Sequence, residues 1–299
     1  MQIGIDVGAT KIESVVLEED GNEKHRSRTE CPKDYLSIIS TIKDIHHNLE
    51  KEFQTDLPIG VCHPGIHSPQ TGLVKNAPNC YWLEKKPFQS DLRKALGKEV
   101  FCENDGNCFA LSEAIDGAGK HYKIVYGIIL GSGAGGGLVI DKQIVSGPNG
   151  VAGEWGHNQI PYFAAKKENF NSNNAREAEV ESFISGLGMA KRFNKIYGKN
   201  LKTNEIFELN RRHDLDAERF VDDFKLNLAM SLSTIINILD PDAFIFGGGV
   251  SNEIDFLSEI ENMVKKFVIG KEYDGVFLKP KYGDASGVRG AARLGRRTT

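Results

Sequence analysis

The sequence predicts an α/β fold made of two halves of similar design. Segments with strand character alternate with segments of helical periodicity, which favours this class. The order strand, glycine turn, strand, then strands alternating with helices occurs twice, from Gln2 and again from about Lys123. We place the first domain at residues 1–117 together with a C-terminal helix at 287–299, and the second domain at 118–286. Two such halves suit an enzyme that closes on its substrates.

The first half begins with three expected strands. A hydrophobic strand in residues 2–7 ends in a glycine turn, and two more strands flank Asp20-Gly21, a dipeptide typical of hairpins. Further along, we expect a strand at 58–63 that runs into a Pro-Gly loop, and a strand at 99–104 that ends in polar residues.

Helices are expected between these strands. Tyr35 to Phe53 is predicted as an amphipathic helix, because apolar residues recur there at helical spacing: Leu36, Ile39, Ile42, Ile45 and Leu49. Phe88 to Leu96 and the segment from 107 to 117 are the other helices of the first half.

The second half repeats the scheme. Residues 122–147 contain two strands that flank the glycine-rich turn GSGAGGG, at Gly131 to Gly137. A long helix is expected from Phe220 to Leu239, followed by the strand DAFIF and three glycines.

Composition and charge narrow the functional classes. The chain has 299 residues, 40% of them hydrophobic and 26% charged, with a formal net charge of −4. This balance gives no strong field for nucleic acid or an anionic membrane. The five cysteines are odd in number and form no CxxC pair, and we find no signal peptide or membrane-length apolar run. We therefore expect a cytoplasmic enzyme with reduced thiols.

The segment DVGATK is the first candidate phosphate site. Gly8 allows a tight turn whose backbone amides can face a phosphate, while Thr10 adds a hydroxyl and Lys11 a positive charge. Asp6 is placed to hold Mg²⁺, usually through water. An ordinary hairpin turn remains the alternative.

Two more glycine clusters are candidates for binding a nucleotide. GSGAGGG lacks the GKS or GKT ending of a P-loop and is not followed by a helix, so neither a P-loop nor a dinucleotide fingerprint fits. Its amides and Ser132 can still cradle phosphates, and GGGV at Gly247 to Val250 lets a flat ring or ribose approach the backbone. The expected contacts are Gly131, Ser132, Gly133, Gly135, Gly248 and Gly249. A flexible turn is the alternative.

Carboxylates follow at the ends of other segments. Asn104 and Asp105 end a strand, and a carboxylate is suited to accept a hydroxyl proton during phosphoryl transfer. The alternative is that Asp105 only caps the next helix. Glu154 and His157, in GEWGH, suit sugar hydroxyls, and Glu181 is a further acceptor or a helix N-terminal charge.

These motifs resemble the ROK family of sugar kinases. DVGATK and GSGAGGG look like the family's two phosphate motifs, ENDGNC like its catalytic loop, GEWGH like its substrate signature and GGGV like its adenosine-side glycines. The resemblance runs from Met1 to about Leu294. It implies a two-domain actin- and hexokinase-like fold of ribonuclease H-like halves, with ATP and sugar in an interdomain cleft.

The resemblance also implies the chemistry. Asp105 would be the base, and the sugar would meet Pro64, Gly65, Asn76, Asn104, Glu154, His157 and Glu181. We expect an ATP- and Mg²⁺-dependent hexose kinase acting on the 6-hydroxyl, with fructose favoured, and a homodimer. The alternatives are an N-acetylglucosamine or glucose/mannose kinase, or a non-catalytic sugar-sensing regulator. For a regulator we would expect a helix-turn-helix segment before DVGATK.

One departure from the family pattern concerns zinc. The family usually binds Zn²⁺ with the histidine of GEWGH and three cysteines placed before the substrate glutamate. Those positions hold Ser172, Asn174 and Glu179 here, which are poor ligands for zinc as a set. We therefore expect no structural zinc and a mobile segment from Phe163 to Ala178. Ala9 also replaces a common glycine of the first motif.

Overall fold

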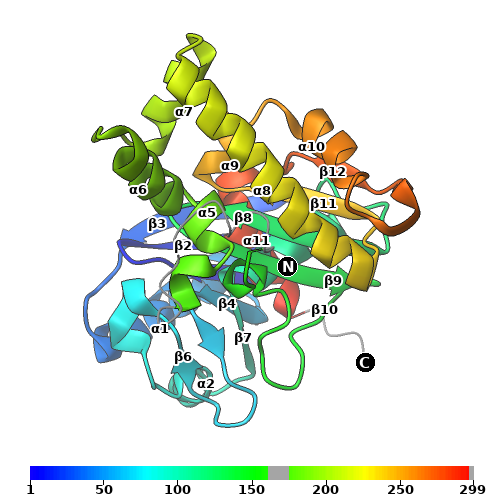
Figure 1. Ribbon diagram of the computed structural model, residues 1–299. Helices are drawn as coiled ribbons and strands as arrows, with labels where there is room; N and C mark the ends of the chain where they lie inside the picture. Colours follow the sequence, from blue (N-terminus) through cyan, green and yellow to red (C-terminus); the bar gives the residue numbers. More distant parts are fainter. Residues whose placement is uncertain (161–174, 296–299) are drawn as a thin grey trace. The chain divides into compact units, whose positions relative to one another are not determined.

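The computed structural model describes residues 1–160 and 175–295 (Figure 1). The chain divides into two compact units. Unit 1 comprises Met1–Lys120, Gly137–Ala152 and Asp284–Thr299, and unit 2 comprises His121–Gly136 and Gly153–Gly283. The boundary predicted at residue 117 lies near the first of these divisions, whereas Gly137–Ala152, which the sequence analysis put in the second domain, groups with unit 1.

The sheet of unit 1 has five strands in the order β3-β2-β1-β4-β7. Their bounds are β1 Gln2–Val7, β2 Lys11–Leu17, β3 Glu23–Glu30, β4 Ile59–His63 and β7 Val100–Asn104. β1 runs antiparallel to β2 and parallel to β4, and β4 runs parallel to β7. The carboxyl ends of β1, β4 and β7 therefore meet at one edge of the sheet, where open α/β sheets bind ligands.

Helices cover both faces of this sheet. They are α1 Tyr35–Phe53, α2 Phe88–Leu96, α3 Asp105–Ile115 and α11 Ser286–Leu294, and the short elements are β5 Ile66–His67, β6 Val74–Lys75, η1 Pro78–Leu83 and η5 Gly283–Ala285. One core joins β1 and β4 to α1 and α2, while α11 packs on the opposite face against Val15 and Leu17.

The first helix confirms its predicted bounds but not its predicted buried face. Asp34 caps it by accepting a hydrogen bond from the Ser37 amide at 2.9 Å. The buried residues are Ile38, Ile42, His46 and Leu49, whereas Leu36 is 76% exposed. The apolar face is thus rotated relative to the row predicted from the sequence.

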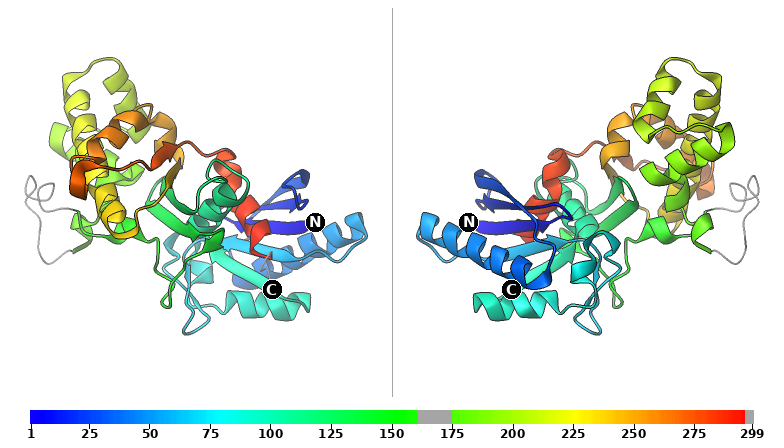
Figure 2. Two further views of the ribbon diagram at one scale, coloured as in Figure 1. Left: turned by 90° about the vertical axis from the view of Figure 1, so that its right-hand side faces the viewer. Right: turned by 90° about the vertical axis from the view of Figure 1, so that its left-hand side faces the viewer.

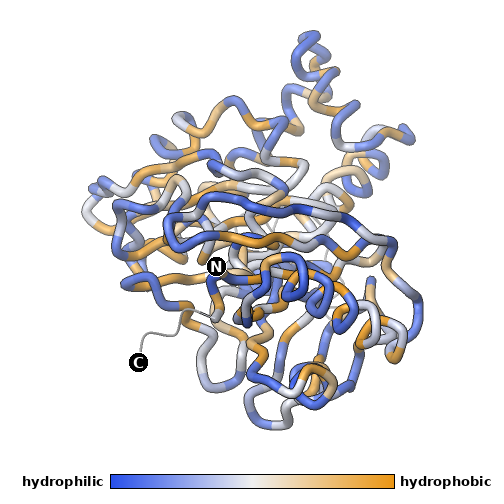
Figure 3. The backbone as a smooth tube through the Cα atoms, turned by 180° about the vertical axis from the view of Figure 1, so that it is seen from behind, coloured by the Kyte–Doolittle hydropathy of each residue, from blue (hydrophilic) through white to orange (hydrophobic). Residues whose placement is uncertain are grey.

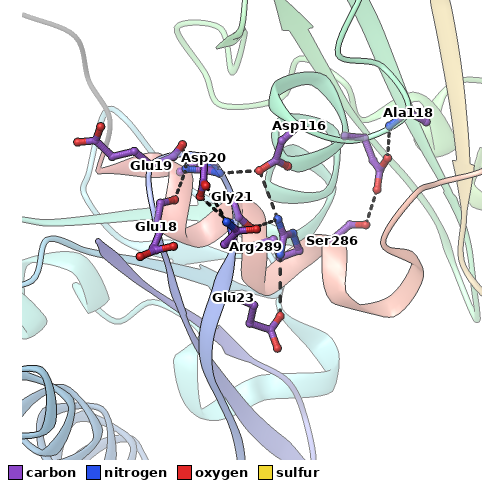
Figure 4. A network of polar contacts seen from close by, with 12 residues as sticks. Glu18, Glu19, Asp20, Gly21, Glu23, Asp116, Ala118, Ser286 and Arg289 are labelled. Atoms are coloured by element: carbon purple, nitrogen blue, oxygen red, sulfur yellow. Dashed lines mark hydrogen bonds and ion pairs between the residues drawn. The ribbon is translucent and has the colours of Figure 1, made fainter.

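The last helix lies directly on the first strand (Figure 2). Gly4 and Gly60 make this approach possible, since a Cβ at either position would collide with a backbone carbonyl of α11. A buried ion-pair network fixes the helix further (Figure 4). Asp116, at the end of α3, accepts from Arg289 at 3.3 Å and from Arg293 at 2.5 Å.

The sheet of unit 2 repeats the strand order of unit 1. It runs β10-β9-β8-β11-β12, and β11 is parallel to both β8 and β12. The bounds are β8 Ile124–Leu130, β9 Ala134–Ile140, β10 Gln143–Ile144, β11 Ala243–Gly247 and β12 Val276–Leu278. In both sheets the first strand is central and the third is at one edge, which confirms the repeated pattern predicted from the sequence.

The other elements of unit 2 are mostly helical. They are η2 Trp155–His157, η3 Ala175–Ala178, α5 Glu181–Ile184, α6 Gly186–Tyr197, α7 Thr203–Arg211, α8 Leu215–Leu239, α9 Gly249–Glu253, α10 Leu257–Val264 and η4 Ile269–Lys271. α8 begins five residues before the predicted Phe220 because Asp214 caps it, accepting from the amides of residues 216 and 217.

Hydrophobic stretches along the chain are short and interrupted by hydrophilic ones (Figure 3). Within residues 1–160 and 175–295, no helix combines the length and the apolar character that a membrane span requires.

Candidate active site

Two carboxylates lie at the carboxyl edge of the unit 1 sheet. Asp6 stands near the end of β1, and Asp105 follows β7 as the first residue of α3. Burial, and next the nearby Asp105 carboxylate, raise the pKa of Asp6 to about 6. Surrounding protein atoms displace water from the Asp105 carboxyl and raise its pKa too, although solvent still reaches the side chain. The structure therefore brings these two predicted residues together.

Asp105 does not act as the cap of its helix. The N-cap is Asn104, whose side-chain oxygen accepts from the Asn107 amide at 2.8 Å. The Asp105 carboxylate accepts from the Gly106 amide at 2.9 Å, which leaves its second oxygen for other partners. The capping role that the sequence left open for Asp105 thus belongs to its neighbour.

The residues around Asp6 fit a divalent cation. The Asp105 carboxylate raises the pKa of Asp6, a positive charge between two carboxylates opposes this effect, and carboxylate oxygen is a ligand that Mg²⁺ accepts. Asp6 and Asp105 supply that oxygen in unit 1.

The turn after β1 is tied to the loop before α1. Gly8 donates its amide to the Lys11 carbonyl at 2.9 Å, and both Thr10 and Lys11 are exposed. Lys33 donates its ammonium to the Ala9 carbonyl and lies 4.9 Å from the centre of the Trp82 ring. Sequence reasoning missed Lys33, because nothing in its local pattern connects it to a turn more than twenty residues earlier.

The loop after β4 joins the predicted sugar-side residues of unit 1. Gly65 has a φ of 80°, and a Cβ there would lie 2.7 Å from the Lys75 carbonyl and 3.1 Å from that of Asn76. Asn76 itself is exposed with a φ of 58°. The His63 Nδ1 donates to the Pro64 carbonyl at 2.9 Å. Pro64, Gly65 and Asn76 therefore belong to one loop cluster.

The glycine cluster GSGAGGG was predicted to form a single turn, and the structure differs. Only Gly131 to Gly133 form the turn, and β9 begins at Ala134, so Gly135 to Gly137 are strand residues. Gly136 is required by packing: a Cβ there would lie 2.7 Å from Trp155 and 2.9 Å from the Gly153 carbonyl. Close contact with a neighbouring segment, and not turn flexibility, explains this glycine.

The segment GEWGH is anchored on this strand. The indole of Trp155 donates to the Gly135 carbonyl at 2.8 Å, and the Tyr126 hydroxyl donates to the Gly153 carbonyl at 3.1 Å. Trp155 is buried, while His157 is exposed and Glu154 is half-buried. The anchor leaves the two predicted sugar-binding side chains at the surface of the segment.

Glu179 supports the imidazole of His157. The His157 Nδ1 lies 3.0 Å from a Glu179 carboxylate oxygen, and this contact orients the ring. The amide of Ile160 donates to the Ala178 carbonyl and the amide of Val180 to the Asn158 carbonyl, and these bonds hold the two segments together. Among the described residues, no group of three or more His, Cys, Asp and Glu side chains is placed to hold a metal. Ser172, Asn174 and most of the segment predicted to be mobile lie outside the described residues.

Glu181 connects the sugar signature to the glycine turn. Its carboxylate accepts from the Ala134 amide at 2.8 Å, and a Cβ at Gly133 would lie 2.6 Å from the same oxygen. Further along the chain from Glu181, the amide of Gly186 donates to the Gly131 carbonyl at 2.8 Å. Glu181 thus holds the turn containing Ser132 in addition to any contact with sugar.

The third glycine cluster lies beside the same turn. Gly248 has a φ of 88°, and a Cβ there would lie 2.5 Å from the carbonyl of Leu130, the last residue of β8. Gly249 begins α9, and space around its Cβ position is open. The predicted nucleotide residues of unit 2 are therefore neighbours, while Asp6, Gly8, Thr10 and Lys11 belong to unit 1.

Comparison with known proteins extends over nearly the whole chain. A model of the ROK family matches residues 2–298. An N-acetyl-D-glucosamine kinase of Pasteurella multocida (strain Pm70) is 36% identical over 304 residues, covering 98% of this chain and 99% of the relative. A ROK hexokinase from Thermus thermophilus has a similar fold, with a TM-score of 0.87 at 23% identity over 98% of this chain and 97% of that one. A ROK family glucokinase from Streptomyces griseus, solved with glucose and AMPPNP, has a TM-score of 0.75 at 26% identity and covers 99% of both chains. These likenesses confirm the predicted hexokinase-like α/β fold.

Proposed function

Because this chain belongs to the ROK family, we propose that it is a sugar kinase that transfers the γ-phosphoryl group of ATP to the 6-hydroxyl of N-acetylglucosamine. The sequence analysis favours fructose as the substrate and gives N-acetylglucosamine as an alternative. The relative that matches 98% of this chain at 36% identity is an N-acetyl-D-glucosamine kinase, and this supports the second substrate over fructose.

The state of Asp105 is the observation that carries the proposed chemistry. Solvent reaches its side chain, burial of the carboxyl by surrounding protein raises its pKa, and Asn104 caps the helix in its place. A base with a raised pKa accepts a proton more readily near neutral pH. As the sugar oxygen bonds to the γ-phosphorus, Asp105 takes the hydroxyl proton, the bond to the β-phosphate oxygen breaks, and ADP leaves.

The remaining candidates take binding roles in this proposal. Asn104, Glu154, His157 and Glu181 hold sugar hydroxyls, and the loop of Pro64, Gly65 and Asn76 lies on the sugar side. The nucleotide contacts are Asp6, Gly8, Thr10, Lys11, Gly131, Ser132, Gly133, Gly135, Gly248 and Gly249. Mg²⁺ bound with ATP would neutralise charge on the phosphate oxygens, and Asp6 is the residue that would hold it, usually through water.

A coupled assay of ADP release tests the proposal. Purified protein is given ATP, Mg²⁺ and, in separate reactions, N-acetylglucosamine, fructose, glucose or mannose, and the product is identified by phosphorus–proton NMR. We expect the highest kcat/KM for N-acetylglucosamine and a 6-phosphate product. A higher kcat/KM for fructose would overturn the substrate, and phosphate on another hydroxyl would overturn the regiochemistry.

Two matched variants separate catalysis from binding. Asp105→Asn keeps the shape of the side chain and removes the proton acceptor, whereas Asp255→Asn makes the same change at an exposed site of unit 2.

Calorimetric binding of sugar without turnover by the wild-type protein would favour the sugar-sensing alternative instead.

A further inference from the structure

Side chains bond to the outward backbone groups of β7, the strand at one edge of the unit 1 sheet. Two of these side chains come from α2: Arg93 donates its Nε to the Val100 carbonyl at 3.1 Å, and the Gln89 side chain accepts from the Cys102 amide at 3.0 Å. Successive residues of a strand direct their backbone groups to alternate sides. The amide of Asn104, two residues after Cys102, therefore also points away from β4.

Glu103 supplies the acceptor for this last amide. Its Oε1 accepts from the Asn104 amide at 2.9 Å, and its Oε2 accepts from the Ser146 hydroxyl at 2.8 Å. Asn104 is only 6% exposed, so its amide would be costly to leave without a partner. Because Ser146 also belongs to unit 1, the Glu103 carboxylate is held at both oxygens within one compact unit.

The amide that Glu103 holds comes directly before the proposed base. Asn104 caps α3 by accepting from the Asn107 amide at 2.8 Å, and Asp105 is the first residue of that helix. A rotation of the peptide between residues 103 and 104 would displace the cap, and the Asp105 backbone would move with it. A misplacement of about 1 Å in an active site can cost about a hundredfold in rate.

We propose that Glu103 is a positioning residue for Asp105. It fixes the Asn104 amide, Ser146 fixes the Glu103 carboxylate, and the end of β7 then presents the base in one orientation. This role rests on the proposed kinase function. Both Glu103 oxygens accept hydrogen bonds from the chain itself, so its action on the reaction is through Asn104 and not by contact with a substrate.

Four variants separate positioning from simple closure of the sheet edge. Glu103→Ala removes both bonds, Ser146→Ala removes one, and Glu103→Gln keeps an acceptor for the Asn104 amide and a donor for Ser146. Gln89→Ala is the matched control, because it removes the same kind of bond two residues earlier on the same edge.

The kinetic expectation is a fall in kcat confined to the Glu103 and Ser146 sites. A hydrogen bond to a charged group changes an equilibrium by about tenfold or more, so we expect Glu103→Ala to lose about tenfold in kcat with little change in the KM for MgATP. Ser146→Ala should lose less, and both Glu103→Gln and Gln89→Ala should stay close to wild type. Equal losses in Glu103→Ala and Gln89→Ala would overturn the role, as would a Glu103→Gln variant as slow as Glu103→Ala.

Amide hydrogen exchange tests the bond without any activity. Rates are measured residue by residue by NMR in the sugar-free protein. We expect the Asn104 amide to exchange about tenfold faster in Glu103→Ala than in wild type and at the wild-type rate in Glu103→Gln. In Gln89→Ala the Cys102 amide should accelerate instead. An unchanged Asn104 rate in Glu103→Ala would overturn the proposal whatever the kinetics.

Failure of the proposed function gives a different result. If the wild-type protein phosphorylates no sugar, the kinase proposal fails and the positioning role with it. The exchange rates still decide whether Glu103 holds the end of β7.

Discussion

Replacing Asp116 with asparagine should destabilise unit 1 strongly. One carboxylate oxygen of Asp116 serves two arginines of α11, whose side chains are only 5% and 1% exposed. The substitution leaves both guanidinium groups buried beside a neutral side chain that has only one acceptor oxygen. Breaking a buried pair by removing one partner costs about 3–5 kcal/mol. Because asparagine keeps one acceptor oxygen, we expect about 3 kcal/mol.

The measurement is a thermal or urea unfolding curve. For a folding unit of 150–250 residues, the size class of unit 1, each kcal/mol moves the melting temperature by about 2–4 °C, so Asp116→Asn should lower the melting temperature of unit 1 by roughly 6–12 °C. Glu23→Gln is the control, because Glu23 lies 3.9 Å from Arg289 but is 33% exposed. We expect less than about 1 kcal/mol there. Similar shifts in the two variants would show that burial does not govern this network.

Four further predictions concern the site. Asp105→Asn should lower kcat by about 10²–10⁴-fold with an unchanged circular dichroism spectrum; retention of a tenth of the activity would exclude it as the base. Folding raises the pKa of Asp6 from 3.8 to about 6. Between these two pH values the folded chain keeps the Asp6 proton while the unfolded chain has lost it, so the free energy of unfolding falls as the pH rises across this range. Asp6→Asn removes this dependence, and its urea midpoint relative to wild type should therefore rise between pH 4 and pH 7; a constant difference would contradict the raised pKa. Gly136→Ala should cost about 1–3 kcal/mol by overpacking against the GEWGH segment, whereas Gly135→Ala, whose Cβ would meet open space, should cost nothing in an unfolding curve. Elemental analysis should find well under one zinc per chain, and a zinc chelator should leave the melting temperature unchanged; stoichiometric zinc would refute the ligand count.

The local elements were largely predictable from the sequence. The bounds of the helices at Tyr35–Phe53 and Phe88–Leu96 agree with the structure, because apolar spacing and flanking residues are local signals. The placement of Asp105 after a strand was predictable in the same way. Which residue caps its helix was not, since Asn104 and Asp105 are both good caps and only the backbone geometry chooses between them.

Features that depend on contacts between distant segments were not predictable. The need for glycine at position 136 comes from Trp155, and the orientation of His157 comes from Glu179. The pairing of Asp6 with Cys62 depends on strand register, which is settled by the whole sheet. Local periodicity contains no information about any of these.

The division of unit 1 into three separate stretches of chain has a consequence for biosynthesis. A ribosome releases Met1–Lys120 long before it releases α11, yet Gly4 and Gly60 have no side chain to cover the face on which α11 lies. Until residues 286–294 emerge, α11 does not cover that face of the sheet, and Arg289 and Arg293 have not yet reached Asp116. β1 and β4 are therefore fully enclosed only after a much later part of the chain has been made, and a nascent chain arrested before α11 should be bound by chaperones and cut by proteases more readily than the completed protein.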